Sequence, residues 1–312
     1  MENAKALPLG KEPEKEPEID VSKIVAINRQ SLTDKLRAYC KKPFSLVLVI
    51  LVLCAALLTA AAVIFIVVYT IIQGLPNLKG SLFAWEYNSD NVSMMPAIIN
   101  TLFLAVMTLV IAVPIGVFAA IFMVEYAKST NVFVKIVRMA AETLSGIPSI
   151  VFGIFGMIFF VEVVGWGFSM LAGIFTMVLM VLPLIMRTTE EALLAVPDSF
   201  REGSYALGAG KLRTIFVILL PAALSGIISG IILALGRVVG ETAALIYTAG
   251  SSRKLAAGFL QSGETLSIHM YFLANEGLHV GEAWATAVVL IALVLIINGA
   301  AEFVGNKLKK EY

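Results

Sequence analysis

Six long uncharged runs constrain this chain more than any other feature of its sequence. They are Pro43 to Ile72, Met94 to Val124, Thr143 to Val161, Val163 to Arg187 (which ends on a charge), Thr214 to Gly236 and Ala283 to Ala301. Each supplies roughly the 20 apolar residues that a helix needs to cross a bilayer. Charged residues make up only 14% of the chain, against about 25% in soluble domains. The sequence therefore predicts an all-α membrane protein with six transmembrane helices in a lipid bilayer.

Basic residues are distributed unevenly over the segments that join the six runs. Nineteen of the 23 Lys and Arg residues lie in the N-terminal tail, the second and fourth connections, and the C-terminal tail. The other connections hold only Lys79, Arg253 and Lys254, and Arg237 lies inside a predicted span. Because Lys- and Arg-rich segments stay in the cytoplasm, both termini are expected there. We expect a multi-pass protein of a bacterial or archaeal plasma (inner) membrane.

Composition divides the chain into four parts. The first is a polar tail that alternates Glu, Lys and Pro, with almost no core-forming side chains, and is expected to be partly disordered and cytoplasmic. Within it, Ser31 to Tyr39 could form a short helix that begins at Ser31. The parts are residues 1–42 (tail), 43–73 (first transmembrane helix), 94–305 (five further helices with a cytoplasmic loop at 197–217) and 306–312 (cytoplasmic C-terminal tail).

The charged loop between the fourth and fifth runs carries five residues at a distinctive spacing: Glu202, Gly208, Ile218, Leu220 and Pro221. Two small residues, Gly203 and Ser204, follow the glutamate. This pattern resembles the EAA loop of ABC importer permeases, in which Glu-Ala-Ala is followed by Gly, Ile and Leu-Pro at the same intervals. The resemblance implies a MetI-like permease core, with the first run as an added N-terminal helix.

The resemblance also implies that this loop docks a separate ATPase subunit. The docking residues would be Glu202, Gly203, Ser204, Tyr205, Ala206, Leu207 and Gly208. A short helix is expected to turn at Gly208, where a positive φ is tolerated, and a second helix to lead to Pro221. The alternative interpretation is an ordinary helical hairpin between two membrane spans.

The chain has no convincing nucleotide-binding loop of its own. Gly210 and Lys211 resemble the end of a phosphate-binding loop, but that motif requires Gly at position 205 and Ser or Thr at position 212. Tyr205 and Leu212 stand there instead. We therefore expect a transport subunit rather than an enzyme, without a cofactor of its own, whose partner ATPase subunits bind ATP and Mg²⁺.

Arg237 directly follows the run Thr214 to Gly236 and is the only basic residue that we place well inside a predicted membrane span. A charge at the bilayer centre costs about 2.5 to 3.5 kcal/mol even on the insertion scale, so Arg237 must face protein or water. It lies sixteen residues after Pro221, which places it about 24 Å along a helix. Glu241 follows at i+4, and two interpretations stay open. The two charges neutralise each other, or Arg237 presents its guanidinium fork to a tetrahedral oxyanion.

The third run contains a proline and two hydroxyls. Pro148 removes a helix hydrogen bond, which is tolerated where the freed backbone groups are buried in protein or line a cavity. Ser145 and Ser149 offer hydroxyl donors beside it. These serines either line the substrate pathway or pack between helices.

Three segments resemble a particular group of permeases. Leu220 to Ile227 and Ala234 to Leu245 are similar to the PstA subunits of phosphate ABC importers, and Gly146 to Gly153 is similar to PstA and its sister subunit PstC. The resemblance implies half of a phosphate pathway, with Arg237, Glu241, Thr242, Ser145 and Ser149 as substrate-pathway residues. The implied partners are a PstC-like permease subunit, two ATPase subunits and a periplasmic or lipoprotein phosphate-binding protein, with no nucleic acid.

Other functions remain as alternatives. A permease for sulfate, molybdate or another oxyanion would also use an arginine. A self-contained channel or secondary transporter would not explain the EAA-like loop, and the inverted repeats common in such transporters are not visible. A membrane enzyme is disfavoured because no nucleophile stands with a base at membrane depth.

The long outer segment from Glu241 to Glu282 carries the only two histidines, His269 and His279. They are ten residues apart without a nearby Cys or Asp, which is a poor spacing for a metal site. Both are expected to face solvent or a partner. The apolar piece Leu266 to Ala274 is expected on the outer surface or as a short helix that dips back.

Overall fold

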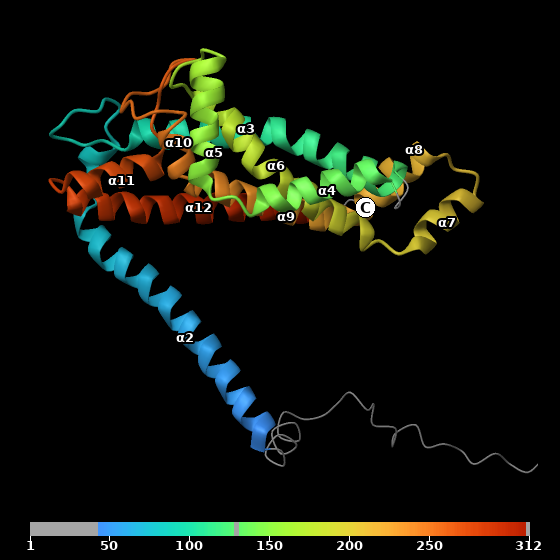
Figure 1. Cartoon of the computed structure of the whole chain (residues 1–312). Coiled ribbons are helices and arrows are strands. Elements are labelled where there is room, and N and C mark those ends of the chain that lie inside the picture. Colours follow the sequence, from blue (N-terminus) through green and yellow to red (C-terminus); the bar gives the residue numbers. More distant parts are fainter. Residues whose placement is uncertain (1–42, 128–130, 310–312) are drawn as a thin grey trace, which may run out of the picture. The chain divides into compact units, whose positions relative to one another are not determined.

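The computed structural model describes residues 43–127 and 131–309, and all regular structure in these residues is helical (Figure 1). The short helix expected at Ser31 to Tyr39, like the rest of the tail, lies outside the described residues. The chain divides into two compact units, Met1–Phe65 and Ile66–Tyr312. The long helix α2 (Pro43–Gly74) begins in the first unit and ends in the second.

The remaining elements all belong to the second unit. They are the short 3₁₀ turns η2 (Leu75–Asn77) and η3 (Gly80–Phe83), α3 (Met95–Ile121), the π-helical turn η4 (Phe122–Tyr126), α4 (Val132–Ser145), α5 (Ser149–Gly156), the π-helical turn η5 (Met157–Val163), α6 (Met170–Leu194), α7 (Asp198–Ala206), α8 (Lys211–Thr214), the π-helical turn η6 (Ile215–Leu219), α9 (Leu220–Gly240), α10 (Ala243–Ile246), α11 (Leu266–Glu276) and α12 (Val280–Lys309).

Five helical stretches are long and apolar enough to cross a membrane: Phe44–Asn77, Met95–Tyr126, Met170–Leu194, Lys211–Gly240 and Val280–Phe303. A sixth span results if α4 and the α5–η5 stretch are counted together. The all-α membrane fold is therefore confirmed.

The run Thr143 to Val161 does not form one continuous helix. The helices on either side of residues 146–148 are bent by 104°. Pro148 lies at the N-cap of α5 with extended backbone, φ −58° and ψ 142°. Proline lacks an N–H and disfavours helical geometry in the residue before it, so α4 ends at Ser145 and a new helix direction begins at Ser149.

Helix α6 forms the centre of the second unit. In its most apolar stretch 67% of the residues are buried, against 28% in the stretches that contain α3 and α9. Small residues let both neighbours approach it closely. A Cβ on Gly116 of α3 would lie 2.8 Å from the Ile185 side chain, and one on Gly230 of α9 would lie 2.0 Å from that of Thr188. The core is therefore built around α6.

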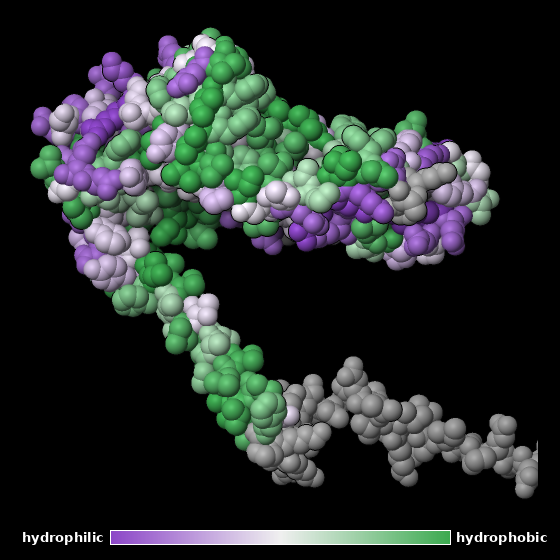
Figure 2. All heavy atoms as spheres, viewed as in Figure 1, coloured by the Kyte–Doolittle hydropathy of each residue, from purple (hydrophilic) through white to green (hydrophobic). Residues whose placement is uncertain are grey.

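Apolar side chains also cover much of the second unit's surface. Figure 2 shows a broad apolar zone over α5 and α6, and more hydrophilic surface towards the end that carries α7 and α8. Phe118, Phe155 and Ile158 are among the exposed apolar side chains. Such a surface suits the interior of a bilayer or contact with other membrane helices.

The second unit has two ends that carry different elements (Figure 1). We call the end with α7 and α8 the loop end. We call the other end, with residues 75–93 and α11, the far end.

Candidate functional site

The turn between α7 and α8 stands at the loop end and is built around Gly208. Gly208 has a φ of +78°, which confirms the predicted turn, since only glycine adopts this conformation without strain. Its N–H donates to the Tyr205 carbonyl at 2.9 Å, and the Ala209 N–H donates to the Ser204 carbonyl at 3.1 Å. These bonds close the end of α7 in the manner of glycine C-caps.

Six of the seven predicted docking residues are on the surface. Glu202, Gly203, Tyr205, Ala206, Leu207 and Gly208 are exposed. Leu207 is 91% exposed, although it is a large apolar residue on a protruding turn. Ser204 is the exception, because it is buried and its Oγ lies 2.8 Å from Thr214 Oγ1. It therefore holds α7 to α8, while its neighbours are exposed.

Of the two interpretations of Arg237, the ion pair with Glu241 is not observed in the described residues. Helix α9 ends at Gly240, and Glu241 is the C-cap with extended backbone, φ −74° and ψ 131°. The Glu241 carboxylate accepts a hydrogen bond from the Ala244 N–H at 3.1 Å. Within the described residues, no hydrogen bond or ion pair joins Arg237 to another side chain. The i,i+4 pairing required the helix to continue, and it stops one residue too early.

Thr242 lies beside a cavity in the second unit. It precedes α10 as the N-cap, and with Ile150, Tyr247, Tyr271 and Trp284 it lines a space of about 680 Å³. This cavity is mostly apolar, and Thr242 supplies one of its few polar groups.

Ser149 and Ser145 lie on opposite sides of the bend at Pro148. Ser149 begins α5, which packs against α10 so closely that a Cβ on Gly153 would lie 2.8 Å from the Ala244 Cα. Ser145 ends α4 and lines a separate cavity of about 230 Å³. The predicted pathway residues therefore fall into two places. One place is the junction of α9 and α10, which carries Arg237, Glu241 and Thr242, with Ser149 on the neighbouring helix α5. The other is the separate cavity beside Ser145.

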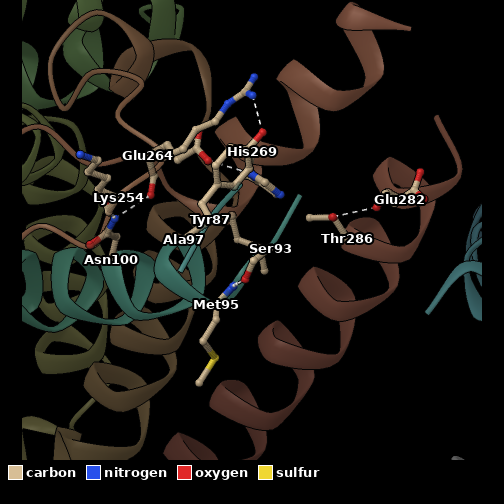
Figure 3. A network of polar contacts seen from close by, with 12 residues as sticks. Tyr87, Ser93, Met95, Ala97, Asn100, Lys254, Glu264, His269, Glu282 and Thr286 are labelled. Carbon is tan, nitrogen blue, oxygen red and sulfur yellow. Dashed lines mark hydrogen bonds and ion pairs between the residues drawn. The ribbon is translucent and has the colours of Figure 1, made fainter. Parts of the chain in front are cut away.

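A buried polar network at the far end was not predicted (Figure 3). His269 of α11 is buried, and its Nδ1 lies 2.7 Å from Oε1 of the equally buried Glu264. The expectation that His269 faces solvent or a partner is therefore wrong. Asn100 of α3 donates to the backbone carbonyls of Lys254 and Glu264, at 3.2 Å each. These contacts fasten the segment before α11 to the start of α3.

Aromatic and charged groups extend this network towards the surface. The Tyr87 ring meets the His269 ring edge-on, with centroids 6.2 Å apart, and the Arg253 guanidinium lies 5.0 Å from the Tyr87 centroid. Arg253 also pairs with Glu276. Burial acts to lower the pKa of Arg253, but Tyr87 and Glu276 outweigh it, so the pKa is raised. Arg253 therefore stays cationic throughout the physiological range.

An asparagine inside an apolar run was the one sequence signal for this network. Asn100 lies early in the run Met94 to Val124, and a buried amide needs hydrogen-bond partners. The residues described in the structure include no group of three or more His, Cys, Asp or Glu side chains that would hold a metal ion.

Comparison with known proteins adds a family and a fold. Residues 112–310 match the family of binding-protein-dependent transport system inner membrane components. The chain is 33% identical over 278 residues to the Probable ABC transporter permease protein YqgI of Bacillus subtilis, covering 83% of this chain and 94% of that protein. It is 36% identical over 211 residues to the phosphate transport system permease protein PstA 1 of Mycobacterium tuberculosis H37Rv, covering 67% and 68%.

A solved structure shares the fold. The inward-facing structure of the MetNI methionine ABC transporter superposes with a TM-score of 0.56 at 22% sequence identity, covering 68% of this chain and 93% of that chain. At this identity the likeness concerns the fold alone, and it confirms the predicted MetI-like arrangement.

Proposed function

This chain belongs to the family of binding-protein-dependent transport system inner membrane components and is a PstA-like permease, and we propose that it forms half of the pathway of an ATP-driven importer of inorganic phosphate. Relatives that are phosphate transport permeases support the substrate. The observation that carries the proposal in the structure is Arg237. It lies in the last turn of the apolar helix α9, partly buried and, within the described residues, without an anionic partner.

An arginine in this state suits a transported oxyanion. Its planar guanidinium offers two parallel N–H donors that match the oxygens of a phosphate. An ion pair with Glu241 would have occupied these donors, but Glu241 is turned to the backbone of α10. We assign the hydroxyl groups of Thr242 and Ser149 to the same pathway as donors. We assign Ser145 to a second position along this pathway.

The turn between α7 and α8 is the surface we assign to a separate ATPase subunit. Exposed Tyr205 and Leu207 supply apolar contact area, and Glu202 supplies a charge. Since Gly208 and the Ser204–Thr214 hydrogen bond fix the shape of the turn, the docking surface is formed before the partner binds. Preformed surfaces lose less conformational freedom on binding.

The complete importer would contain two permease subunits and two ATPase subunits. A PstC-like permease would complete the pathway, and a phosphate-binding protein would deliver substrate at the far end. Both chain termini and the loop end would then lie in the cytoplasm of a bacterial or archaeal cell.

Uptake of labelled phosphate tests the proposal, in cells that lack other phosphate importers. We expect Arg237→Gln to assemble normally, because it breaks no ion pair within the described chain, and to lose phosphate uptake. Arg237→Lys should also be impaired, since an ammonium cannot make the two-pronged contact. Arg187→Gln is the matched control, because that side chain is exposed and, among the described residues, its one ion pair is with Glu191 on its own helix. Competition by sulfate or molybdate that equals competition by phosphate would assign another oxyanion.

A further inference from the structure

Arg201 of α7 is the most fully bonded side chain at the loop end. Only 15% of it is exposed. Its Nε donates to Glu125 Oε1 at 3.0 Å, and its Nη2 lies 2.9 Å from the same oxygen. Nη2 also donates to the Leu193 carbonyl at 3.1 Å, while Nη1 donates to the Val196 carbonyl at 3.0 Å and to Asp198 at 3.1 Å. Four of these five contacts are hydrogen bonds, and together they engage all three nitrogens of the guanidinium group.

The partners of Arg201 belong to different helices. Glu125, whose side chain is 6% exposed, lies in the π-helical turn that ends α3. Leu193 lies in the last turn of α6, where backbone carbonyls have no donor within the helix, and Val196 lies two residues beyond the end of α6. One side chain of α7 therefore joins α7 to the ends of α3 and α6. A lysine has three donors and no fork, so it cannot replace all these contacts.

A second contact joins the same part of α3 to α8. The Lys211 ammonium at the start of α8 lies 4.6 Å from the centroid of the Tyr126 ring. Tyr126 is the neighbour of Glu125 in the π-helical turn. Both helices of the loop are thus attached to two consecutive residues at the end of α3.

The helix ends beneath the loop are themselves packed together. Ile121 of α3, Leu193 and Val196 at the end of α6, and Ile215 and Leu219 of the π-helical turn before α9 form one buried apolar cluster. Close packing of this kind transmits a displacement, because interiors have few voids to absorb it.

We propose that Arg201 is a positioning residue that makes α7 move together with the ends of α3 and α6. A displacement of the docked ATPase would then shift these two membrane helices directly. This inference rests on the proposed function, in which the ATPase docks at α7. It goes further by naming the side chains, Arg201 and Glu125, through which the loop acts on the membrane helices.

The ion pair Arg187–Glu191 provides a matched contrast at the same end. Its two side chains are 60% and 63% exposed, and both belong to α6. A surface pair within one helix contributes little and joins no second element. Arg187→Gln therefore removes an arginine and an ion pair without loosening the loop.

The test uses the complete importer, reconstituted in proteoliposomes with its partner permease, ATPase subunits and binding protein, and measures phosphate transported per ATP hydrolysed. We expect Glu125→Gln to retain the ATPase and to lose roughly tenfold in this ratio, because Arg201 loses its buried anionic partner. Arg201→Lys can keep the charge pair, but without the planar fork it cannot reach the Glu125 carboxylate and both carbonyls together, and it should lose coupling as well. Arg187→Gln should match the parent protein.

A docking readout separates failure of this inference from failure of the proposed function. In a protein whose Cys40 and Cys54 are replaced by serine, Leu207→Cys should form a cross-link to the ATPase. Absence of that cross-link in Leu207→Cys with Arg201 and Glu125 unchanged would refute docking at the loop. A normal cross-link with full coupling in Glu125→Gln and Arg201→Lys would overturn the role of Arg201. If both variants fail to assemble, Arg201 serves assembly only, and the inference is equally wrong.

Discussion

Replacement of Gly208 by valine isolates the backbone geometry of the docking turn. A Cβ at this position meets no atom within 4 Å, so the substitution causes no clash. The whole cost comes from the φ of +78°, where a side chain costs roughly 1–2 kcal/mol, and more for a β-branched residue. At about 2 kcal/mol the native turn loses a factor of roughly 30 against other conformations.

The expected order of impairment is Val > Ala > Asn, because asparagine tolerates the left-handed region best among non-glycine residues. Capture of the ATPase by the affinity-tagged permease, together with phosphate uptake, measures the effect at matched expression. Gly210→Val is the control. Gly210 has a φ of −76° and equally open surroundings, so a side chain is accepted there. Normal capture and uptake by Gly208→Val, or equal loss in Gly210→Val, would show that the turn geometry does not matter for docking.

Three further predictions concern other parts of the chain. A reporter fused after Tyr312 should be cytoplasmic and one inserted near Asn88 external; finding both on one side would contradict the span count. Glu264→Ala should lower the free energy of unfolding by about 1–3 kcal/mol, because it leaves the buried His269 unpaired. His279→Ala is the control, because that side chain is partly exposed, and it should change stability little. Thermal unfolding in detergent measures both variants. Pro148→Ala should preserve assembly yet reduce transport by straightening the bend after α4, and unchanged uptake would show that the bend is not needed.

The sequence predicted what depends on local pattern. Long apolar runs became helices because only helices satisfy their backbone groups within a bilayer. Gly208 adopts the predicted turn because the conformation depends on that residue itself. Pro148 also signalled its effect, but the apolar run around it was long enough to be interpreted as one span, and the bend was missed.

Contacts between distant segments were beyond the reach of one sequence. Arg201 and Glu125 are 76 residues apart, and no sequence motif indicates that the two side chains pair. His269 was expected to face solvent or a partner because the spacing of the two histidines does not suit a metal site. Its buried partner Glu264 precedes α11, so no helical spacing indicated the pair. The Arg237–Glu241 ion pair, one of the two interpretations left open, is absent for a local reason that Gly240 signalled, since glycine commonly ends a helix.

Transport of phosphate by the purified, reconstituted importer is the decisive measurement for the role of this chain. Proteoliposomes would contain this chain with its partner permease and ATPase subunits, and would be supplied with loaded binding protein and labelled phosphate. We expect ATP-dependent accumulation of phosphate with the parent protein and none with an Arg237→Gln complex that retains its ATPase. Undiminished accumulation by the Arg237→Gln complex, or accumulation of sulfate or molybdate in place of phosphate by the parent protein, would contradict the assignment of Arg237 to a phosphate pathway.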